Sequence, residues 1–200
     1  PVARQIDEAG GHCLLVTSDK DCRQLITARV HLFNMRKNEI FDDVALQAVW
    51  GIRPDQVVDF QAIVGDSTDN IPGVAGIGPK GAQELLAKYG TLEEVFAHVN
   101  EITGAKQKKL IAGRELAFKS RELARLKNDM PIEIDWQVAA PGHFNMAVVA
   151  DLCREAGFRQ LARRVELLAD KLGRSATPSA RDVPPVEVAA EDEPLEPRTE

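Results

Sequence analysis

The chain has 200 residues, of which 44% are hydrophobic and 28% charged, and its formal net charge is −6. This composition suits one globular domain with a core, or one domain plus a tail, and its short apolar runs exclude a membrane span. The three cysteines form no C-x-x-C pair, which argues against a disulfide or zinc framework and predicts reduced thiols in a cytoplasmic protein.

The negative charge is unevenly distributed along the chain. Residues 175–200 carry a net charge of −5, so the preceding 174 residues carry only −1. Within them, residues 104–127 hold eight lysines and arginines against two glutamates, a net charge of +6. This basic segment is either a solvated helical face or a nucleic-acid contact, and the overall charge therefore does not exclude a nucleic-acid partner.

Residues 1–50 predict alternating helices and strands. The pattern indicates the end of an amphipathic helix over 2–10, a strand of the buried type over 12–17, a short helix over 22–26 and a second strand over 30–33. This order predicts a parallel α/β layer, in which functional groups collect at the carboxyl ends of the strands. Asp19 and Asp21 follow the first strand at such an end.

Residues 51–172 predict a mostly helical second domain. Gly65 to Gly78 reads as a loop, and Pro79 opens a helix that Gly90 ends. A capping box at Thr91 and Glu94 starts the next helix. The other helices of this domain are expected at 53–64, 106–112, 115–126, 146–156 and 158–172, and one more at 43–50, just before it. Residues 173–200 are rich in proline and acids and have no aromatic residue, which predicts a disordered linker or tail.

The turn between the predicted helices around residue 78 has the composition of a phosphate-binding hairpin. Glycines allow a phosphate close to the backbone, and the next helix N-terminus directs free N–H groups at it. Lys80 adds a charge-assisted contact. The alternative is an ordinary glycine-rich turn, but the combination favours sequence-independent binding of DNA phosphates. The residues expected at this contact are Gly73, Gly76, Ile77, Gly78 and Lys80.

Two pairs of aspartates, Asp19 with Asp21 and Asp66 with Asp69, are candidate metal ligands. Hydrolysis of a phosphodiester uses divalent ions that activate water and neutralise charge, and carboxylate oxygens suit Mg²⁺ or Mn²⁺. Clustered carboxylates also need a compensating cation. Alternatively, the first pair caps the following helix and the second forms a turn. The neighbouring phosphate-binding hairpin favours the metal site.

Several of these segments closely resemble the 5′→3′ exonuclease domain of bacterial DNA polymerase I, which belongs to the flap endonuclease family. The resemblance covers roughly residues 2–168, with the spacing in agreement. The motifs that carry it are Thr17–Asp21, Gln24-Leu25, Asp59-Phe60-x-Ala62, Gly65–Gly73 and Gly76-Ile77-Gly78-x-Lys80.

The resemblance implies roles for these residues. Asp19, Asp21, Asp66 and Asp69 match metal-site aspartates of the family, in a two-metal site for Mg²⁺ or Mn²⁺. Gly76 to Lys80 match the helix-three-turn-helix that grips the duplex and holds a monovalent cation, K⁺, through backbone carbonyls. Lys20, between two of the aspartates, is a further expected DNA contact.

The resemblance also implies an architecture. We expect an α/β fold: the C-terminal part of a parallel-sheet (PIN-like) nuclease core over residues 1–50, and a helix-hairpin-helix subdomain with core-packing helices over 51–172. The acidic segment 173–200 resembles a linker to polymerase domains. Further carboxylates, arch residues and the first strand of the family domain would lie upstream of Val2, so we expect a truncated, weakly active or inactive fragment.

The predicted function is therefore metal-dependent 5′→3′ exonuclease or 5′-flap endonuclease activity in DNA replication and repair. The substrate would be duplex DNA with a 5′ end or flap, and the protein would act as a cytoplasmic monomer. The main alternative is a non-catalytic helix-hairpin-helix module that binds duplex DNA, and a third is a nuclease that acts on RNA.

Overall fold

The computed structural model describes residues 1–137, 139 and 145–173. Its contacts divide the chain into two compact units, Pro1–Ile134 and Asp135–Glu200, which are described separately. None of the helices in the described ranges has the length and apolar character needed to cross a membrane. The domain boundaries expected near residues 50 and 172 stay a prediction.

Unit 1 begins with a small α/β layer. Helix α1 (Val2–Glu8) precedes strand β1 (Cys13–Val16), and the 3₁₀ helix η1 (Asp21–Leu25) leads to β2 (Val30–Asn34) and β3 (Glu39–Phe41). β1 pairs in parallel with β2, from Cys13 opposite Val30 to Val16 opposite Phe33, which confirms the predicted parallel pair. The sheet order is β1-β2-β3, so β2 is central.

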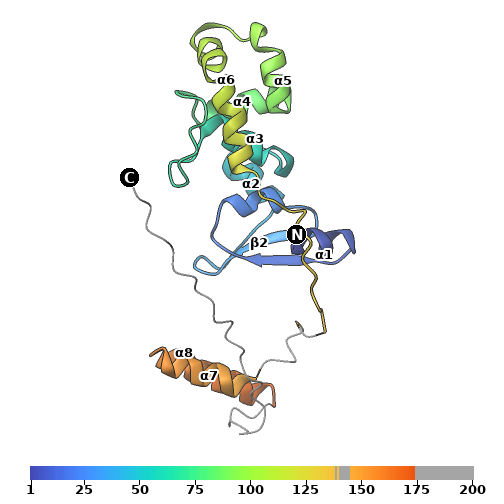
Figure 1. Cartoon of the computed structure of the whole chain (residues 1–200), viewed down its shortest axis with the longest axis vertical. Helices are drawn as coiled ribbons and strands as arrows, with labels where there is room; N and C mark the ends of the chain where they lie inside the picture. The colour runs from blue at the N-terminus through green and yellow to red at the C-terminus, as the bar shows by residue number, and fades with distance from the viewer. Residues whose placement is uncertain (138, 140–144, 174–200) are drawn as a thin grey trace, which may run out of the picture. The chain divides into compact units, whose positions relative to one another are not determined.

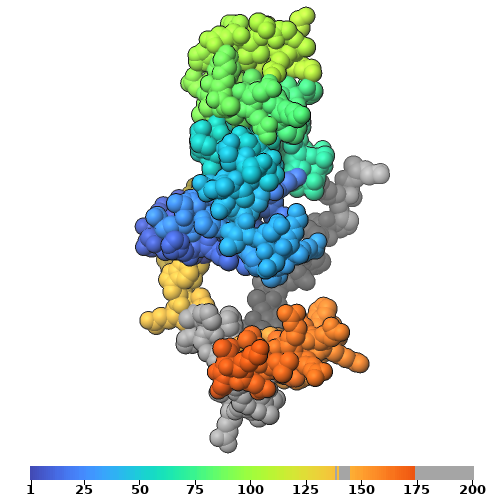
Figure 2. Space-filling view, turned by 180° about the vertical axis from the view of Figure 1, so that it is seen from behind, coloured from blue at the N-terminus to red at the C-terminus, as the bar shows by residue number. Residues whose placement is uncertain are grey.

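The rest of unit 1 is helical. Its elements are α2 (Asp43–Trp50), η2 (Pro54–Gln56), α3 (Val57–Val64), α4 (Pro79–Tyr89), α5 (Leu92–Ala97), η3 (Val99–Glu101) and α6 (Gly104–Ala124). One buried apolar cluster joins them, with residues from every helix from α2 to α6, and α3 packs along α6. In both views α2 and α3 lie between the α/β layer and the far end formed by α5 and the start of α6 (Figures 1 and 2).

Local signals set several helix boundaries where the sequence predicts them. The Asp42 carboxylate accepts a hydrogen bond from the Ala45 amide at 2.9 Å and caps α2, which Gly51 ends in the left-handed conformation. Pro79 occupies the first turn of α4 and Gly90 follows its last residue. The Thr91 hydroxyl accepts the Glu94 amide at 3.3 Å and caps α5.

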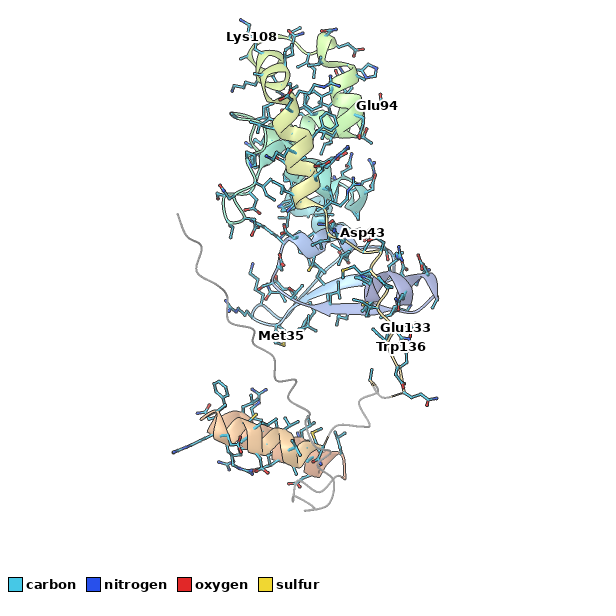
Figure 3. The ribbon with its side chains drawn as sticks, in the orientation of Figure 1. Met35, Asp43, Glu94, Lys108, Glu133 and Trp136 are labelled. Carbon is cyan, nitrogen blue, oxygen red and sulfur yellow. The ribbon has the colours of Figure 1, made fainter. Side chains whose placement is uncertain are left out.

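Three expectations for the α/β layer are corrected. β1 is not a buried strand: Leu14 and Val16, which alternate onto the same face, are 50% and 56% exposed because that face is open to solvent. The expected helix over 22–26 is a 3₁₀ helix. The antiparallel strand β3 was not predicted; it follows a turn in which Asn38 has a φ of 54° and from which Met35 projects (Figure 3).

The two helices expected over 106–112 and 115–126 are one helix, α6. Gly113 is buried and continues the helix, although glycine is a poor helix former. A side chain at this position would meet Val74, since an added Cβ would lie 2.9 Å from the Val74 Cγ1. Gly113 therefore provides room for the loop before α4 and does not end a helix.

Unit 2 contains the helical hairpin α7 (Met146–Glu155) and α8 (Arg159–Lys171), close to the expected bounds. The two helices pack against each other, and Arg154 of α7 forms an ion pair with Glu166 of α8. Ala150 and Ala169 are fully buried. Apart from Gly173, the predicted acidic tail lies outside the described residues.

Candidate metal site and nucleic-acid interface

The loop of residues 65–78 joins α3 to α4 and carries most of the predicted site. At its start, the amides and carbonyls of Asp66 and Ile71 exchange two hydrogen bonds of 2.8 Å each, and this closes residues 66–71 into a tight turn. Gly65 and Gly73 lie against each other there with φ of 78° and 63°. A Cβ at Gly73 would lie 2.4 Å from the Gly65 nitrogen, so the closure requires glycine.

The turn brings two predicted metal ligands together with a third from another element. Carboxylate oxygens of Asp66, Asp69 and Asp21, which begins η1, all lie within 4.8 Å of one another. Asp66 is buried, Asp21 is partly buried and Asp69 is exposed, so the group has a deep side and a side open to solvent. Three carboxylate oxygens at this separation match the hard donor set that Mg²⁺ and Mn²⁺ prefer.

Two neighbouring side chains hold the buried part of this acidic cluster. Lys20 forms an ion pair with the Asp66 carboxylate, whose other oxygen accepts the Thr68 amide at 2.9 Å. The Gln61 Nε2 on α3 donates to the Asp21 Oδ1 at 2.5 Å. Gln61 is 3% exposed, so its amide fixes that carboxylate from inside the core.

The electrostatics of the acidic cluster call for a cation. Burial raises the pKa of the Asp66 carboxyl, but the hydrogen bonds from Lys20 and Thr68 outweigh it and bring the pKa below its ordinary value. The pKa of the Asp69 carboxyl is raised by desolvation and by the negative charges of Asp66 and Asp21. A single lysine therefore leaves repulsion among the three carboxylates, which a divalent ion would relieve. The donor set fits such an ion.

Asp19, the fourth predicted ligand, is not among these three carboxylates. Its Oδ1 accepts the Asp21 amide at 2.9 Å, and its own amide donates to the Thr17 hydroxyl at 3.0 Å. Asp19 thus shapes the turn that presents Lys20 and Asp21 to Asp66. Its predicted role as a ligand stays a prediction.

The predicted phosphate-binding hairpin occupies the other end of the loop. Ile77 is buried and anchors it to the apolar cluster, while Gly76, Gly78 and Lys80 are exposed. Gly78 is extended and precedes the first turn of α4, whose first N–H groups have no acceptor within the helix, and Lys80 lies in that turn. This arrangement provides what a helix N-terminus needs to bind a phosphate.

Helix α6 fastens the hairpin by contacts that sequence reasoning missed. The Ser120 hydroxyl, which is fully buried, accepts the Gly73 amide at 3.0 Å. The Lys109 Nζ donates to the Gly76 carbonyl at 2.9 Å. Neither residue follows a local motif, and only the packing of α6 across the loop brings them there.

In the basic segment of residues 104–127, some basic side chains form ion pairs within the helical core and others are exposed to solvent. Arg121 pairs with Asp59 and Glu93, and Lys106 pairs with Glu84 at 2.6 Å. Lys108 points outward at the far end of unit 1, and Lys119 is also exposed (Figure 3). Part of the segment therefore stabilises the helical core, and the exposed remainder is available to a ligand.

Comparison with known proteins identifies relatives of the chain. Residues 52–147 match the family model described as 5′-3′ exonuclease, C-terminal SAM fold. DNA polymerase I of Rhizobium leguminosarum is 34% identical over 169 residues, which are 84% of this chain and 17% of that protein. A 5′-3′ exonuclease of Buchnera aphidicola is 35% identical over 137 residues, which are 65% of this chain and 48% of that protein.

A solved structure supports the fold. The structure of T5 5′-exonuclease with bound divalent zinc ions matches with a TM-score of 0.54 and 24% identity, over 62% of this chain and 47% of that one. The chain thus spans less than a fifth of the Rhizobium polymerase and about half of the Buchnera exonuclease and of the T5 protein. The chain belongs to the 5′-3′ exonuclease family, and it covers part of the family domain.

Proposed function

We propose that this chain is the portion of a 5′-3′ exonuclease domain that binds duplex DNA and supplies one carboxylate cluster to a divalent metal site. The domain would hydrolyse phosphodiesters near a 5′ end or at a 5′ flap, in DNA replication and repair. The observation that carries the proposal is the placement of carboxylate oxygens of Asp66, Asp69 and Asp21 within 4.8 Å of one another. Asp66 and Asp69 lie on the loop that ends in the phosphate-binding hairpin, and Asp21 begins η1.

Each part of the site has a distinct task in this proposal. Asp21, Asp66 and Asp69 would hold Mg²⁺ or Mn²⁺, and such an ion activates water and neutralises charge on the phosphate. Asp19 remains a further candidate ligand. The hairpin backbone from Gly73 to Gly78, with Lys80, would bind phosphates of the duplex without reading its sequence. Lys20 would release Asp66 to the ion and contact DNA.

Other parts of the proposal rest on the relatives. The Gly76 carbonyl already accepts a cationic group, the Lys109 ammonium, and K⁺ is the candidate for the same position when DNA is bound. From the similarity to DNA polymerase I, we propose that the same protein also contains polymerase domains. We further propose that the protein acts as a monomer in the cytoplasm, where its three free cysteines would stay reduced.

One observation favours the alternative of a non-catalytic DNA-binding module. Lys20 already neutralises Asp66, and three carboxylates form one ion's ligand set among the described residues, whereas two-metal hydrolysis uses two. We therefore expect the 200-residue chain alone to cleave slowly or not at all. A loss of one electrostatic stabiliser lowers a rate by about 10²–10³.

The test combines metal binding with cleavage. Titration with Mn²⁺, followed by electron paramagnetic resonance, should show binding that Asp66→Asn weakens at least about tenfold, since even a change beyond the ligands costs 10–100-fold. The matched control is Asp55→Asn, an exposed aspartate paired with Arg53. If Asp66→Asn binds Mn²⁺ as well as the wild type does, the metal assignment is wrong.

Cleavage is then measured on a 5′-flap duplex with Mg²⁺ or Mn²⁺. The chain is compared with a longer protein that extends it at the N-terminus through the rest of the family domain. We expect efficient cleavage only by the longer protein, and its loss there on Asp66→Asn. Cleavage of a matched RNA duplex at the same rate would favour the RNA nuclease instead. Binding without cleavage by the longer protein would favour the non-catalytic module.

A further inference from the structure

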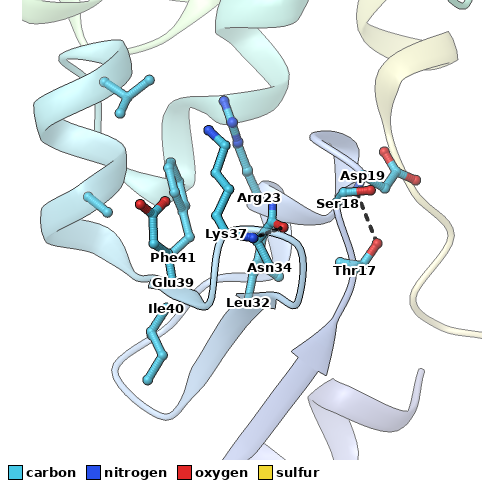
Figure 4. A pocket seen from close by; sticks show the side chains of 12 residues that line it. Thr17, Ser18, Asp19, Arg23, Leu32, Asn34, Lys37, Glu39, Ile40 and Phe41 are labelled. Carbon is cyan, nitrogen blue, oxygen red and sulfur yellow. Dashed lines mark hydrogen bonds between the residues drawn. The ribbon is translucent and has the colours of Figure 1, made fainter.

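A pocket lies beside the acidic cluster, on the α/β layer. It has a volume of about 390 Å³ and is bounded by the residues after β1, by η1, by the turn between β2 and β3, and by α2 (Figure 4). Asp19 lines this pocket. Val49 lines both this pocket and a neighbouring one, which is also lined by Lys20 and Asp66. A ligand in this pocket would therefore lie next to the proposed metal site.

The main feature of the pocket is Arg23. Its guanidinium carbon lies 4.5 Å from the centre of the Phe41 ring and 4.3 Å from the Trp50 ring, so the two aromatic side chains hold it in place. The guanidinium forms no hydrogen bond or ion pair with any residue that the structure describes. By contrast, Arg29, Arg53 and Arg154 each pair with a carboxylate.

The Arg23 guanidinium is therefore available to bind an anion. Burial lowers the pKa of the Arg23 guanidinium from its ordinary value, but arginine remains protonated. Its N–H donors lie against the rings and have no acceptor among the described residues, which favours bidentate contact with a phosphate. The side chain of Lys37, which also lines the pocket and lies on the same side as Arg23 in Figure 4, adds a second positive charge.

The remaining wall suits a nucleotide better than a simple anion. Asp19 and Glu39 balance the two cations, so the pocket would not concentrate anions by net charge alone. Their carboxylates offer acceptors for the amino groups of a base. Ile40 is 57% exposed and gives the wall an apolar surface. A phosphate joined to a base that carries an amino group satisfies all of these groups.

We propose that this pocket binds one unpaired nucleotide of the DNA strand next to the cleavage site, with Arg23 and Lys37 on its phosphate. The proposal rests on the proposed function, since it assumes a DNA substrate at the acidic cluster. It assigns the single-stranded part of the substrate to the α/β layer, whereas the duplex contacts the hairpin of the helical part.

The test compares two DNA probes by fluorescence anisotropy in the presence of a chelator. One is a blunt duplex and the other is the same duplex with a short 5′ deoxyadenosine overhang. The wild-type chain should bind the overhang probe more tightly. Arg23→Met, which removes the guanidinium and keeps an apolar side chain of similar length, should weaken binding of the overhang probe about tenfold, the effect of one charge-assisted contact, and leave the blunt probe unchanged.

Lys37→Ala is the second variant, because Lys37 lies in an exposed turn where truncation does not disturb packing. It should reduce the same preference by a smaller factor. Arg53→Ala, which removes an exposed arginine outside the pocket, is the control and should keep the full preference.

The outcomes separate the two proposals. If the wild type binds both probes equally, or if both variants keep the preference for the overhang, the nucleotide pocket is wrong while duplex binding stands. If the wild type binds neither probe, the proposed function fails, and the pocket proposal that rests on it fails as well.

Discussion

The acidic cluster and the hairpin lie at the two ends of one loop, yet they suit ligands of opposite charge. At residues 66–69 the loop presents carboxylates, which Asp21 from η1 joins and which Lys20 and Gln61 hold. At residues 76–80 it presents backbone N–H groups and an exposed lysine. A cation and a phosphate can therefore bind at the two ends of a segment of fifteen residues.

The two ends of the loop depend on different interactions. The acidic cluster requires side chains from two other elements, because like charges must be held together against their repulsion. The hairpin requires a backbone shape, which glycines permit and the contacts from Ser120 and Lys109 support. The close approach of Gly65 and Gly73 between the two ends is common to both. Three substitutions test this division, beginning with the largest expected effect.

Gly73→Ala should disrupt both ends of the loop. The new Cβ would overlap the backbone of Gly65, 2.4 Å from its nitrogen, in a conformation that alanine disfavours, so we expect a loss of about 3 kcal/mol or more in the free energy of unfolding. Chemical denaturation followed by circular dichroism measures it. Gly90→Ala is the control, because Gly90 also has a positive φ of 85° but no atom within 4 Å of its Cβ position, and it should lose only the cost of backbone strain, about 1–3 kcal/mol. Equal losses would show that the close approach does not matter.

Ser120→Ala should affect the hairpin end and leave the acidic cluster intact. The change leaves the buried Gly73 amide without its acceptor, which costs about 1–3 kcal/mol of stability. Mn²⁺ affinity should not change, because Ser120 does not contact the carboxylates. Ser67→Ala, at an exposed serine of the same loop, should alter stability little. A fall in Mn²⁺ affinity for Ser120→Ala at full stability would contradict the separation of the two ends.

Lys80→Ala should have the smallest effect, confined to DNA binding. Loss of one phosphate contact weakens binding equally for all sequences and reduces the slope of log affinity against log salt by about one unit. Binding of a duplex is measured at several salt concentrations. Lys88→Ala is the matched control, since Lys88 lies at the other end of α4 and contacts Tyr89 and Glu101. An unchanged slope for Lys80→Ala would remove this lysine from the interface.

Features whose causes lie within one or two turns of chain could be predicted from the sequence. Pro79 and Gly90 mark the two ends of α4 because backbone preference acts locally. The hairpin is contiguous, so its glycines and Lys80 were visible as a motif. The pairing of β1 with β2 also followed from their spacing.

Contacts between residues far apart in the chain depend on how the helices pack and could not be predicted. Gln61 reaches Asp21 across 40 positions, and Ser120 reaches Gly73 across 47, through the packing of α3 and α6. Tertiary contacts also leave Asp19 outside the group of three carboxylates, set Gly113 of α6 against Val74, and bring the Arg23 guanidinium over the Phe41 and Trp50 rings. Such contacts leave no periodic signal in the sequence, because their partners are chosen by the folded surfaces and not by neighbouring residues.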